Sequence, residues 1–349
     1  MFDVVTFGSA TRDIFVRSKD FKIIESPDFV TGKGLAVNAG SKVYVDELIF
    51  ASGGGGTNTA ATFVSQGLKV AYVGLVGNDS SGKEIVAELK KIGVICDFVK
   101  DTDKADTPVS IILSAPGKPA PRPVRRSFNE GGSLGEGGER SILVYEGASH
   151  LLAPEDVPWS VIGESKWLYL SGLSGESSKV FAPIINFAEK NDIKMAVNPG
   201  HDQLTRDLNL LRSLLNKINI LIVNQEEASI IAGIDYQKEE LFKKLDELAD
   251  GVVVMSKGPN GVAVSDGKTI YRAGIPESGY VDRTGSGDAF GSGFVSAIVR
   301  GENIESAIQL GTANATSVVQ KIGAKNGILK KDEWGEWKRV EVEKAPIKS

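Results

Sequence analysis

Residues 281–290 read VDRTGSGDAF, a polar glycine turn that leads directly into a helical pattern of apolar residues. Gly285 and Gly287 flank Ser286 in this turn, so successive backbone N–H groups can face one point. A helix N-terminus of this kind attracts anions, because its first N–H groups lack partners and the helix dipole is positive there. The stretch therefore predicts an anion-binding site at the start of a helix.

Asp288 lies at the same helix end and has two interpretations. Aspartate is a favoured helix cap, and glycines are common in turns. A carboxylate beside a phosphate repels it, however, and this suits a general base that takes a proton from a hydroxyl attacking that phosphate. Both interpretations stay open on this stretch alone.

The composition is that of an ordinary globular protein. The 349 residues are 41% hydrophobic and 24% charged, enough for a sizeable core in one large α/β domain or two smaller ones. The net charge of -5 and the lack of a long Lys/Arg block argue against a nucleic-acid partner. The single cysteine, Cys96, excludes an internal disulfide, and the 2 histidines argue against a Cys/His zinc site. Because no apolar stretch reaches membrane-spanning length, we expect a soluble, cytoplasmic protein without membrane contact.

Short apolar strands alternate with amphipathic helices along most of the chain. This order predicts a doubly wound, mostly parallel sheet with helices on both faces. Residues 2–7 are expected to form the first strand, and residues 262–265 and 269–272 a hairpin through Asp266-Gly267. No internal repeat and no linker divides the chain, so we expect a single domain over residues 1–349.

A small β-sheet is expected beside the main sheet, because several β-rich segments follow one another without a helix between them. They cover residues 14–16, 42–51, 108–113 and 141–145. Since these segments are separated along the chain, the small sheet is inserted into the main domain. Its segments span approximately residues 12–51 and 106–148.

Polar residues follow the predicted strands at their carboxyl ends, where open α/β sheets bind ligands. Asp13 follows the first strand and suits a substrate hydroxyl, although a turn aspartate explains it equally well. Residues 53–56 are consecutive glycines before a helix, which lets the backbone approach a ligand, and Asn58 offers both a donor and an acceptor. The alternative is a flexible connection with a helix cap. The glycines do not form the GxGxxG fingerprint of dinucleotide-binding proteins.

Two further segments have competing interpretations. Residues 77–84 nearly match a Walker loop, but Glu84 replaces the Ser or Thr that binds Mg²⁺, so we interpret them as a helix start. Asn224 and Glu227 suit a water shell around Mg²⁺ or a capping box, and the segment alone favours the cap.

Residues 115–138 are rich in Pro, Gly and Arg, which predicts a long loop. Its arginines, Arg122, Arg125 and Arg126, either meet a substrate phosphate or are solvated. The solvated alternative is favoured.

Together these segments resemble the ribokinase-like (PfkB) family of carbohydrate and nucleoside kinases, from Phe2 to about Gly327. The most specific motifs are SGGGGTNTAATFVSQGLKVAYVGLVGNDSSG at residues 52–82 and VDRTGSGDAF at residues 281–290, and NQEE at residues 224–227 is similar to the family's NxxE. The resemblance implies a ribokinase-like fold with a β-sheet lid that closes on the sugar. It also implies a homodimer, because lids pair in many relatives.

The resemblance further implies a role for each matched residue. Asp288 resembles the catalytic base, and its anion hole is implied at Gly285, Ser286 and Gly287. Substrate binding is implied for Asp13, Gly54, Gly55 and Asn58, and nucleotide binding for Asn224, Ser256, Gly258, Gly261 and Asn314. Glu227 is implied to hold Mg²⁺ through water, and Asp282 and Thr284 to hold a monovalent cation such as K⁺. The sequence departs from the family at Arg283, which replaces a small Thr, and at the long 115–138 loop.

We therefore expect an ATP-dependent phosphotransferase that moves the γ-phosphate to a hydroxymethyl group of a sugar, with Asp288 as general base. One alternative acceptor is a nucleoside whose base stacks on Phe15, Tyr44 or Phe50 of the lid. Another is a sugar phosphate that meets the arginine loop. A non-catalytic sugar or nucleotide sensor is a different class, but a sensor has no use for the base.

Overall fold

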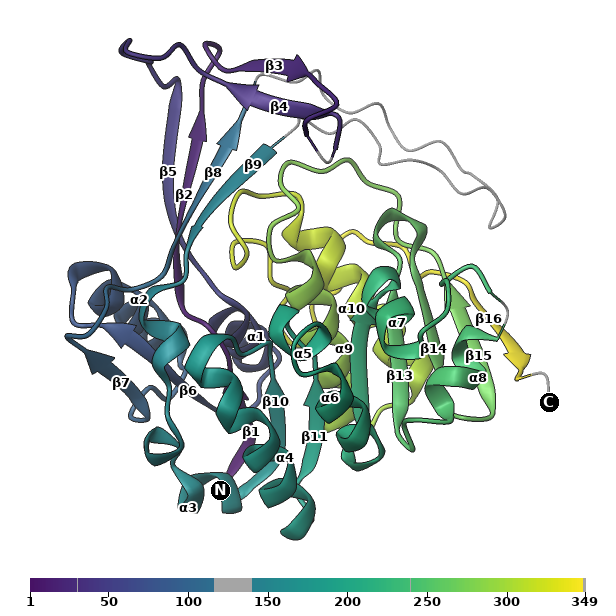
Figure 1. Cartoon of the computed structure of the whole chain (residues 1–349). Coiled ribbons are helices and arrows are strands. Elements are labelled where there is room, and N and C mark those ends of the chain that lie inside the picture. The colour runs from purple at the N-terminus through teal and green to yellow at the C-terminus, as the bar shows by residue number, and fades with distance from the viewer. Residues whose placement is uncertain (30, 116–139, 239, 348–349) are drawn as a thin grey trace.

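The computed structural model describes residues 1–29, 31–115, 140–238 and 240–347. Figure 1 shows a large twisted sheet flanked by helices, with a smaller sheet projecting from one of its ends. The predicted loop at residues 115–138, including Arg122, Arg125 and Arg126, lies outside the described residues apart from Ala115. The predicted fold class, an α/β sheet with helices on both faces and a small β-sheet, is confirmed.

The main sheet is parallel from β7 to β13 and antiparallel beyond, as the strand pairings show. Its central strands are largely buried, and all residues of β6 are buried, as expected for a sheet covered on both faces. The strand order across the sheet is β16 (Val342–Pro346), β15 (Thr269–Ala273), β14 (Val262–Ser265), β13 (Val252–Ser256), β12 (Ile220–Asn224), β11 (Lys194–Val197), β10 (Ser165–Leu170), β1 (Phe2–Phe7), β6 (Val70–Gly77) and β7 (Val99–Thr102).

Each face of the main sheet carries its own hydrophobic core. One core joins the sheet to α4 (Phe181–Lys190), α6 (Leu208–Leu214), α7 (Gln225–Ala232) and α8 (Leu241–Asp246). The opposite core joins it to α1 (Gly55–Ser65), α2 (Ser80–Ile92), α9 (Ser286–Val299) and α10 (Ile304–Val318). Short helices complete the links: η1 (Gly147–Leu151), η2 (Pro154–Asp156), α3 (Trp159–Gly163), η3 (Gly175–Val180), α5 (His201–Leu204), η4 (Leu215–Lys217) and η5 (Gly258–Asn260). Among the helices of the described ranges, none is long and apolar enough to cross a membrane.

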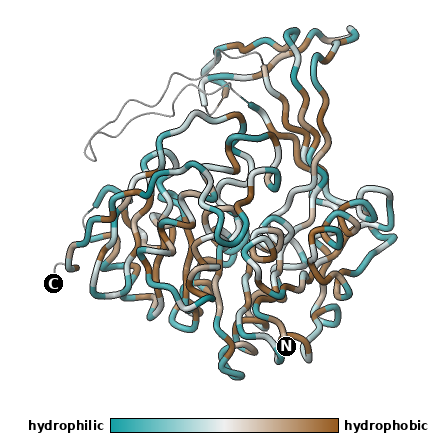
Figure 2. The backbone as a smooth tube through the Cα atoms, turned by 180° about the vertical axis from the view of Figure 1, so that it is seen from behind, coloured by the Kyte–Doolittle hydropathy of each residue, from teal (hydrophilic) through white to brown (hydrophobic). Residues whose placement is uncertain are grey.

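The small sheet contains the four predicted segments, in the order β5 (Glu47–Gly53), β2 (Thr11–Arg17), β8 (Val109–Ser114) and β9 (Arg140–Tyr145). A hairpin of β3 (Lys22–Glu25) and β4 (Lys33–Ala36) extends it, and together these six strands are called the lid. The lid is not purely antiparallel, because β2 and β8 run parallel. Figure 2 shows hydrophobic stretches along the lid strands as well as along the main sheet.

The order of the main strands reverses between β1 and β10. From β1 the chain continues to β6 and β7 on one side, whereas β10 leads to β11 and β12 on the other. The backbone N–H of Ser171, just after β10, donates to the carbonyl of Phe7 at the end of β1 (3.0 Å). Ligands of open α/β sheets bind at such a switch point, beyond the carboxyl ends of the strands.

Two local predictions are settled by hydrogen bonds. The near-Walker segment is a helix start, because Asp79 caps α2 and accepts from the backbone N–H of Gly82 (2.8 Å). The hairpin of β14 and β15 is confirmed, but the antiparallel addition of β16 to β15 was not predicted.

Candidate active site

Asp288 lies in the first turn of α9 and meets Asn58 from the first turn of α1. The side-chain Nδ2 of Asn58 donates to Oδ2 of Asp288 at 2.8 Å. Burial raises the pKa of Asp288, while the hydrogen bond from Asn58 and the positive charge of Lys325 lower it. Gly285, and not Asp288, occupies the N-cap position of α9. The geometry thus favours the general-base interpretation over the cap.

The start of α9 is shaped by a close approach of two loops. Gly285 adopts a positive φ of 75°, and a Cβ there would lie 2.2 Å from Cβ of Ala324. A side chain at this position would therefore push the loop of residues 323–325 away. Beyond Gly285, the N–H of Ser286 donates to the carbonyl of Arg283 (3.3 Å). The N–H groups of Gly287 and Asp288 belong to the first turn, where helix amides lack an acceptor within the helix. A Cβ added at Gly287 would meet no atom within 4 Å, so the predicted anion hole is open.

The glycines before α1 let three chain segments meet. A Cβ at Gly53 would lie 2.1 Å from Oδ2 of Asp13, and one at Gly54, where φ is 95°, would lie 2.4 Å from the carbonyl oxygen of Ser9. A Cβ at Gly55 would lie 3.6 Å from Oδ1 of Asp288. The predicted substrate residues Asp13, Gly54, Gly55 and Asn58 are therefore neighbours of the predicted base.

Asp13 is a buried carboxyl group on β2, with 4% of its surface exposed. Burial raises its pKa to about 6, and the negative charges of Asp282 and Asp288 act in the same direction, whereas Lys325 lowers it. Carboxyl groups with raised pKa values cluster at functional sites. Asp13 lies within strand β2 and is therefore not a turn aspartate.

Lys325 is a site residue that the sequence did not reveal. Its Nζ donates to the carbonyl oxygen of Ser52 (2.9 Å), to Oγ of Ser52 (3.2 Å) and to Oγ1 of Thr57 (2.9 Å). Burial lowers the pKa of Lys325 to about 8, while the carboxylates of Asp13, Glu88 and Asp288 oppose that change. Its ammonium group is thus a fixed counter-charge behind the two aspartates.

Two buried polar atoms at the crevice have no hydrogen-bond partner among the described residues. They are Oδ1 of Asn58 and Oγ of Ser171. Both residues are at most 5% exposed, and a Cβ on Gly55 would lie 3.0 Å from Oγ of Ser171. A buried polar atom without a partner is costly, so both atoms are suited to meet hydroxyl groups of a bound molecule. Ser171 was not among the site residues predicted from the sequence.

Asn224 and Glu227 form a reciprocal cap at the start of α7. The backbone N–H of Glu227 donates to Oδ1 of Asn224 (2.9 Å), and the backbone N–H of Asn224 donates to Oε2 of Glu227 (2.8 Å). The capping box predicted from the segment is therefore present, and burial raises the pKa of Glu227. One carboxylate oxygen of Glu227, Oε1, takes no part in the cap.

The predicted nucleotide residues of the next strand lie beside this cap. Ser256 ends β13 and pairs in register with Asn224. Gly258 and Gly261 follow in the adjoining turn with φ values of 55° and 88°. Asn314 lies apart from them and is completely buried. Its Nδ2 donates to the carbonyl of Ala289 (2.8 Å) and its Oδ1 accepts from the N–H of Leu329 (2.8 Å), contacts that favour a structural role.

The predicted cation residues, Asp282 and Thr284, do come together. Oδ1 of Asp282 accepts from the backbone N–H of Thr284 (3.1 Å) and from its hydroxyl (2.8 Å). Arg140 of the lid also donates to both residues. Arg283 points elsewhere, with its guanidinium carbon 4.2 Å from the centre of the Tyr280 ring.

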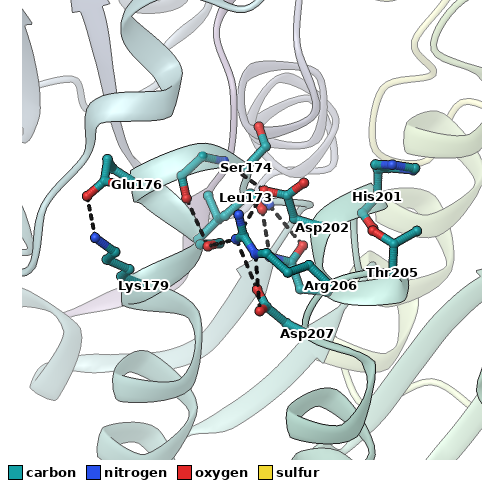
Figure 3. Close-up of polar contacts among 12 residues, drawn as sticks. Leu173, Ser174, Glu176, Lys179, His201, Asp202, Thr205, Arg206 and Asp207 are labelled. Carbon is teal, nitrogen blue, oxygen red and sulfur yellow. Dashed lines mark hydrogen bonds and ion pairs between the residues drawn. The ribbon is translucent and has the colours of Figure 1, made fainter.

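A polar network braces the loops that follow β10 and β11 (Figure 3). The carboxylate of Asp202 accepts from the backbone N–H of Gly175 (2.8 Å), and Arg206 donates to Oγ of Ser178 (2.5 Å). Gln203 donates to the carbonyl of Leu173 (2.6 Å). These bonds tie the loop that begins at Ser171 to the neighbouring loop.

Comparison with known proteins identifies the fold and the family. The family described as pfkB family carbohydrate kinase matches residues 1–119 and 133–331. Ribokinase of Haemophilus influenzae is 28% identical over 290 residues, which are 81% of this chain and 86% of the relative. ATP-dependent 6-phosphofructokinase of Thermoanaerobacterium thermosaccharolyticum is 25% identical over 280 residues, which are 78% of this chain and 80% of the relative.

Among solved structures, Arabidopsis thaliana ribokinase complexed with ribose and ATP shares the fold. The TM-score is 0.73 at 21% identity, with 94% of this chain and 96% of the other covered. The family match spans most of the chain, including the segments that bring Asn58 to Asp288. The chain therefore belongs to the pfkB family of carbohydrate kinases, and it is an ATP-dependent carbohydrate kinase.

Proposed function

We propose that the protein transfers the γ-phosphate of ATP to a hydroxymethyl group of a sugar, with Asp288 as the general base. The observation that carries this proposal is the contact of Asn58 with Asp288 at the N-terminus of α9. It places a carboxylate and an open helix start together, next to the switch point of the sheet. A base beside an anion site is what phosphoryl transfer to an alcohol needs.

In the proposed step, Asp288 accepts the proton of the sugar hydroxyl while the hydroxyl oxygen bonds to the γ-phosphorus. The bond from that phosphorus to the bridging oxygen breaks, and ADP leaves with the electron pair. The N–H groups of Gly285, Ser286, Gly287 and Asp288 stabilise charge on the transferred group. Asn58 orients the base and, through its free Oδ1, binds a sugar hydroxyl.

The remaining polar groups of the crevice hold the sugar. Asp13 accepts hydrogen bonds from sugar hydroxyls, and the backbone at Gly54 and Gly55 gives the sugar close access to Asp288. Lys325 keeps positive charge near both aspartates, which favours their ionised forms. This assignment follows from the proximity of these residues to one another and from their burial.

Mg²⁺ and the nucleotide are assigned to the neighbouring strand ends. No cluster of three or more His, Cys, Asp or Glu side chains within the described ranges could hold a metal. This fits Mg²⁺, which binds largely to phosphate oxygens and water. Glu227 would hold such water through the oxygen not used in its cap, near Asn224. When bound, the ion neutralises phosphate charge. Ser256, Gly258 and Gly261 are assigned to the nucleotide.

A sugar is favoured over a nucleoside by the positions of the lid aromatics. Phe50 pairs directly with Ile14, so it faces away from Asp13, since side chains alternate along a strand. Tyr44 precedes β5 and is 75% exposed. Phe15 shares the face of Asp13 but is itself packed, with 9% exposed. Of these three aromatic residues, only Phe15 is therefore placed where a nucleoside base could stack on it.

We also propose that two copies associate through their lids. β9 is the outermost lid strand, and its apolar side chains are largely exposed: Ile142, Leu143, Val144 and Tyr145. Exposed apolar surface of this kind marks interaction sites. A reducing, cytoplasmic location is part of the same proposal, supported by the single buried cysteine, Cys96.

The test measures ADP release from Mg·ATP with a panel of sugars, sugar phosphates and nucleosides, for the wild type and Asp288→Asn. We expect one sugar to stimulate turnover. The variant should lose about 10²–10⁴ in kcat, the usual contribution of a positioned base. Its melting temperature should be at or above that of the wild type, because burial disfavours the charged carboxylate. Asp250→Asn, at an exposed surface aspartate, is the control and should be fully active. An Asp288→Asn enzyme with the normal rate, or sugar binding without any turnover, would exclude the proposed role.

A further inference from the structure

Asp282 is a nearly buried carboxylate whose oxygens are already engaged. Its side chain is 9% exposed. Oδ1 accepts from the N–H and the hydroxyl of Thr284, and Oδ2 accepts from the backbone N–H of Gly323 (3.3 Å). Thr284 directly precedes Gly285, the N-cap of α9. Asp282 thus organises the turn that leads into the anion hole.

The positive charge at this turn comes from the lid. Nη1 of Arg140, the first residue of β9, lies 2.9 Å from Oδ1 of Asp282 and 2.9 Å from Oγ1 of Thr284. Arg140 therefore donates to side-chain oxygens of the two residues that were expected to bind a monovalent cation. The sequence drew attention to Arg283, but that side chain lies over Tyr280 instead.

A monovalent cation does not fit beside this arginine. K⁺ needs oxygen atoms with free lone pairs, whereas N–H donors already occupy these two oxygens. A second cation next to the guanidinium would also meet like-charge repulsion, which is strong in a partly buried site. Arginine keeps its charge at every physiological pH, so the site holds a permanent positive charge.

We propose that Arg140 is a positioning residue that serves as a built-in cation for the anion-hole turn. Its guanidinium holds Asp282 and Thr284 in place and makes catalysis independent of K⁺. The inference rests on the proposed kinase function. Because Arg140 belongs to the lid and Asp282 to the main domain, the same contact joins the lid to the catalytic turn.

The lid offers a matched control for this test. Arg17 and Arg140 both pair with Ser114, from opposite sides of β8. Arg17 bonds Glu47 within the lid (3.2 Å), although it lines the same cavity as Asp282. Arg17→Ala therefore removes an arginine from the same row of the lid while the bond from Arg140 to Asp282 stays in place.

The experiment compares the wild type, Arg140→Ala and Arg17→Ala in KCl and in N-methylglucamine chloride of equal ionic strength. For the wild type and Arg17→Ala, we expect the same kcat and the same melting temperature in both salts. Arg140→Ala should lose roughly tenfold in kcat without K⁺, a loss within the usual range of coupling between neighbouring sites. K⁺ should restore part of that rate and raise the melting temperature of this variant, because Asp282 and Thr284 are then free to bind it.

The melting temperature separates this inference from the kinase proposal. If no acceptor is found, the salt dependence of unfolding still reports whether Arg140 excludes K⁺. Stimulation or thermal stabilisation of the wild type by K⁺ would overturn the inference. The inference would also be overturned if K⁺ changed neither the kcat nor the melting temperature of Arg140→Ala.

Discussion

The side-chain amide of Asn58 donates a hydrogen bond of 2.8 Å to the carboxylate of Asp288, joining the first turns of α1 and α9 across 230 residues of sequence. This bond gives the proposed base a fixed direction. It also stabilises the ionised form of the carboxylate against the effect of burial. The bond is therefore expected to control both the rate and its pH dependence.

Asn58→Ala should move the acid limb of the pH–rate profile to higher pH. Asp288 must be ionised to accept a proton, so activity falls as the pH drops through its pKa, and loss of the Asn58 bond raises that pKa. A hydrogen bond to a charged group contributes about 1.5–3 kcal/mol, and one pKa unit is about 1.4 kcal/mol. The limb should thus move by about one unit or more in kcat/KM. Asn191→Ala, at an exposed carboxamide that bonds Phe187, should leave the profile unchanged.

Lys325→Met should also move the acid limb of the pH–rate profile to higher pH. The positive charge of Lys325 lowers the pKa values of Asp13 and Asp288, so its removal raises both. Lys321→Met removes an exposed lysine four residues away and serves as the control. A variant with a lower melting temperature but an unshifted pH limb would show that Lys325 only anchors Ser52 and Thr57.

Asp13→Asn should make the protein more stable and less active. The folded-state pKa of Asp13 is raised from 3.8 to about 6, so its contribution to stability is fully present below pH 3.8 and lost as the pH rises through about 6. Above that pH range, the raised pKa of Asp13 lowers the free energy of unfolding by at most roughly 3 kcal/mol. Denaturant titration at pH 8 should show the gain, and the gain should shrink towards pH 4, while kcat/KM falls.

The control for that experiment is Asp246→Asn. Burial raises the pKa of Asp246 to about 6 as well, but this residue bonds Ser265 (2.8 Å), next to the hairpin turn. It should bring a similar gain in stability with normal activity. If Asp13→Asn is destabilising at pH 8, its carboxylate is not strained by burial in the folded state.

Glu227→Gln should raise the Mg²⁺ concentration needed for half-maximal activity. Glutamine can keep the cap of α7, so the substitution removes the charge and leaves the helix start intact. Glu226→Gln, at an exposed neighbour, should leave the Mg²⁺ dependence unchanged. If both variants need the same Mg²⁺ concentration for half-maximal activity, Glu227 serves only to cap α7. The melting temperature shows whether the cap survives.

The main fold was predictable because its signals are local. The apolar runs of β1, β6 and β12 and the glycine turns before α1 and α9 each identify an element by themselves. Pairing is not local: the parallel alignment of β2 with β8 joins segments almost a hundred residues apart. β16 gives a weak signal because its sequence, VEKAP, lacks apolar alternation.

The site was predictable where a motif carries it and hidden where a single side chain carries it. Asp288 and Asn58 follow recognisable glycine turns, and Asp13 follows the first strand. Lys325 follows a glycine turn and looks like any solvated lysine, and its burial depends on Ser52 and Thr57 from a distant segment. Arg140 borders a Pro/Gly/Arg-rich stretch, so only the folded chain shows that it reaches Asp282.

The two sheets end in edges of opposite character. β16 closes one edge of the main sheet with exposed Glu343, Lys344 and Pro346, residues that oppose the addition of another strand. β9 closes the lid with Leu143 and Val144, which are 55% and 63% exposed. An apolar edge of this kind is a template for mispairing whenever no second lid covers it. Newly made chains should therefore aggregate through the lid edge. Val144→Lys should suppress this aggregation and should also dissociate the proposed dimer.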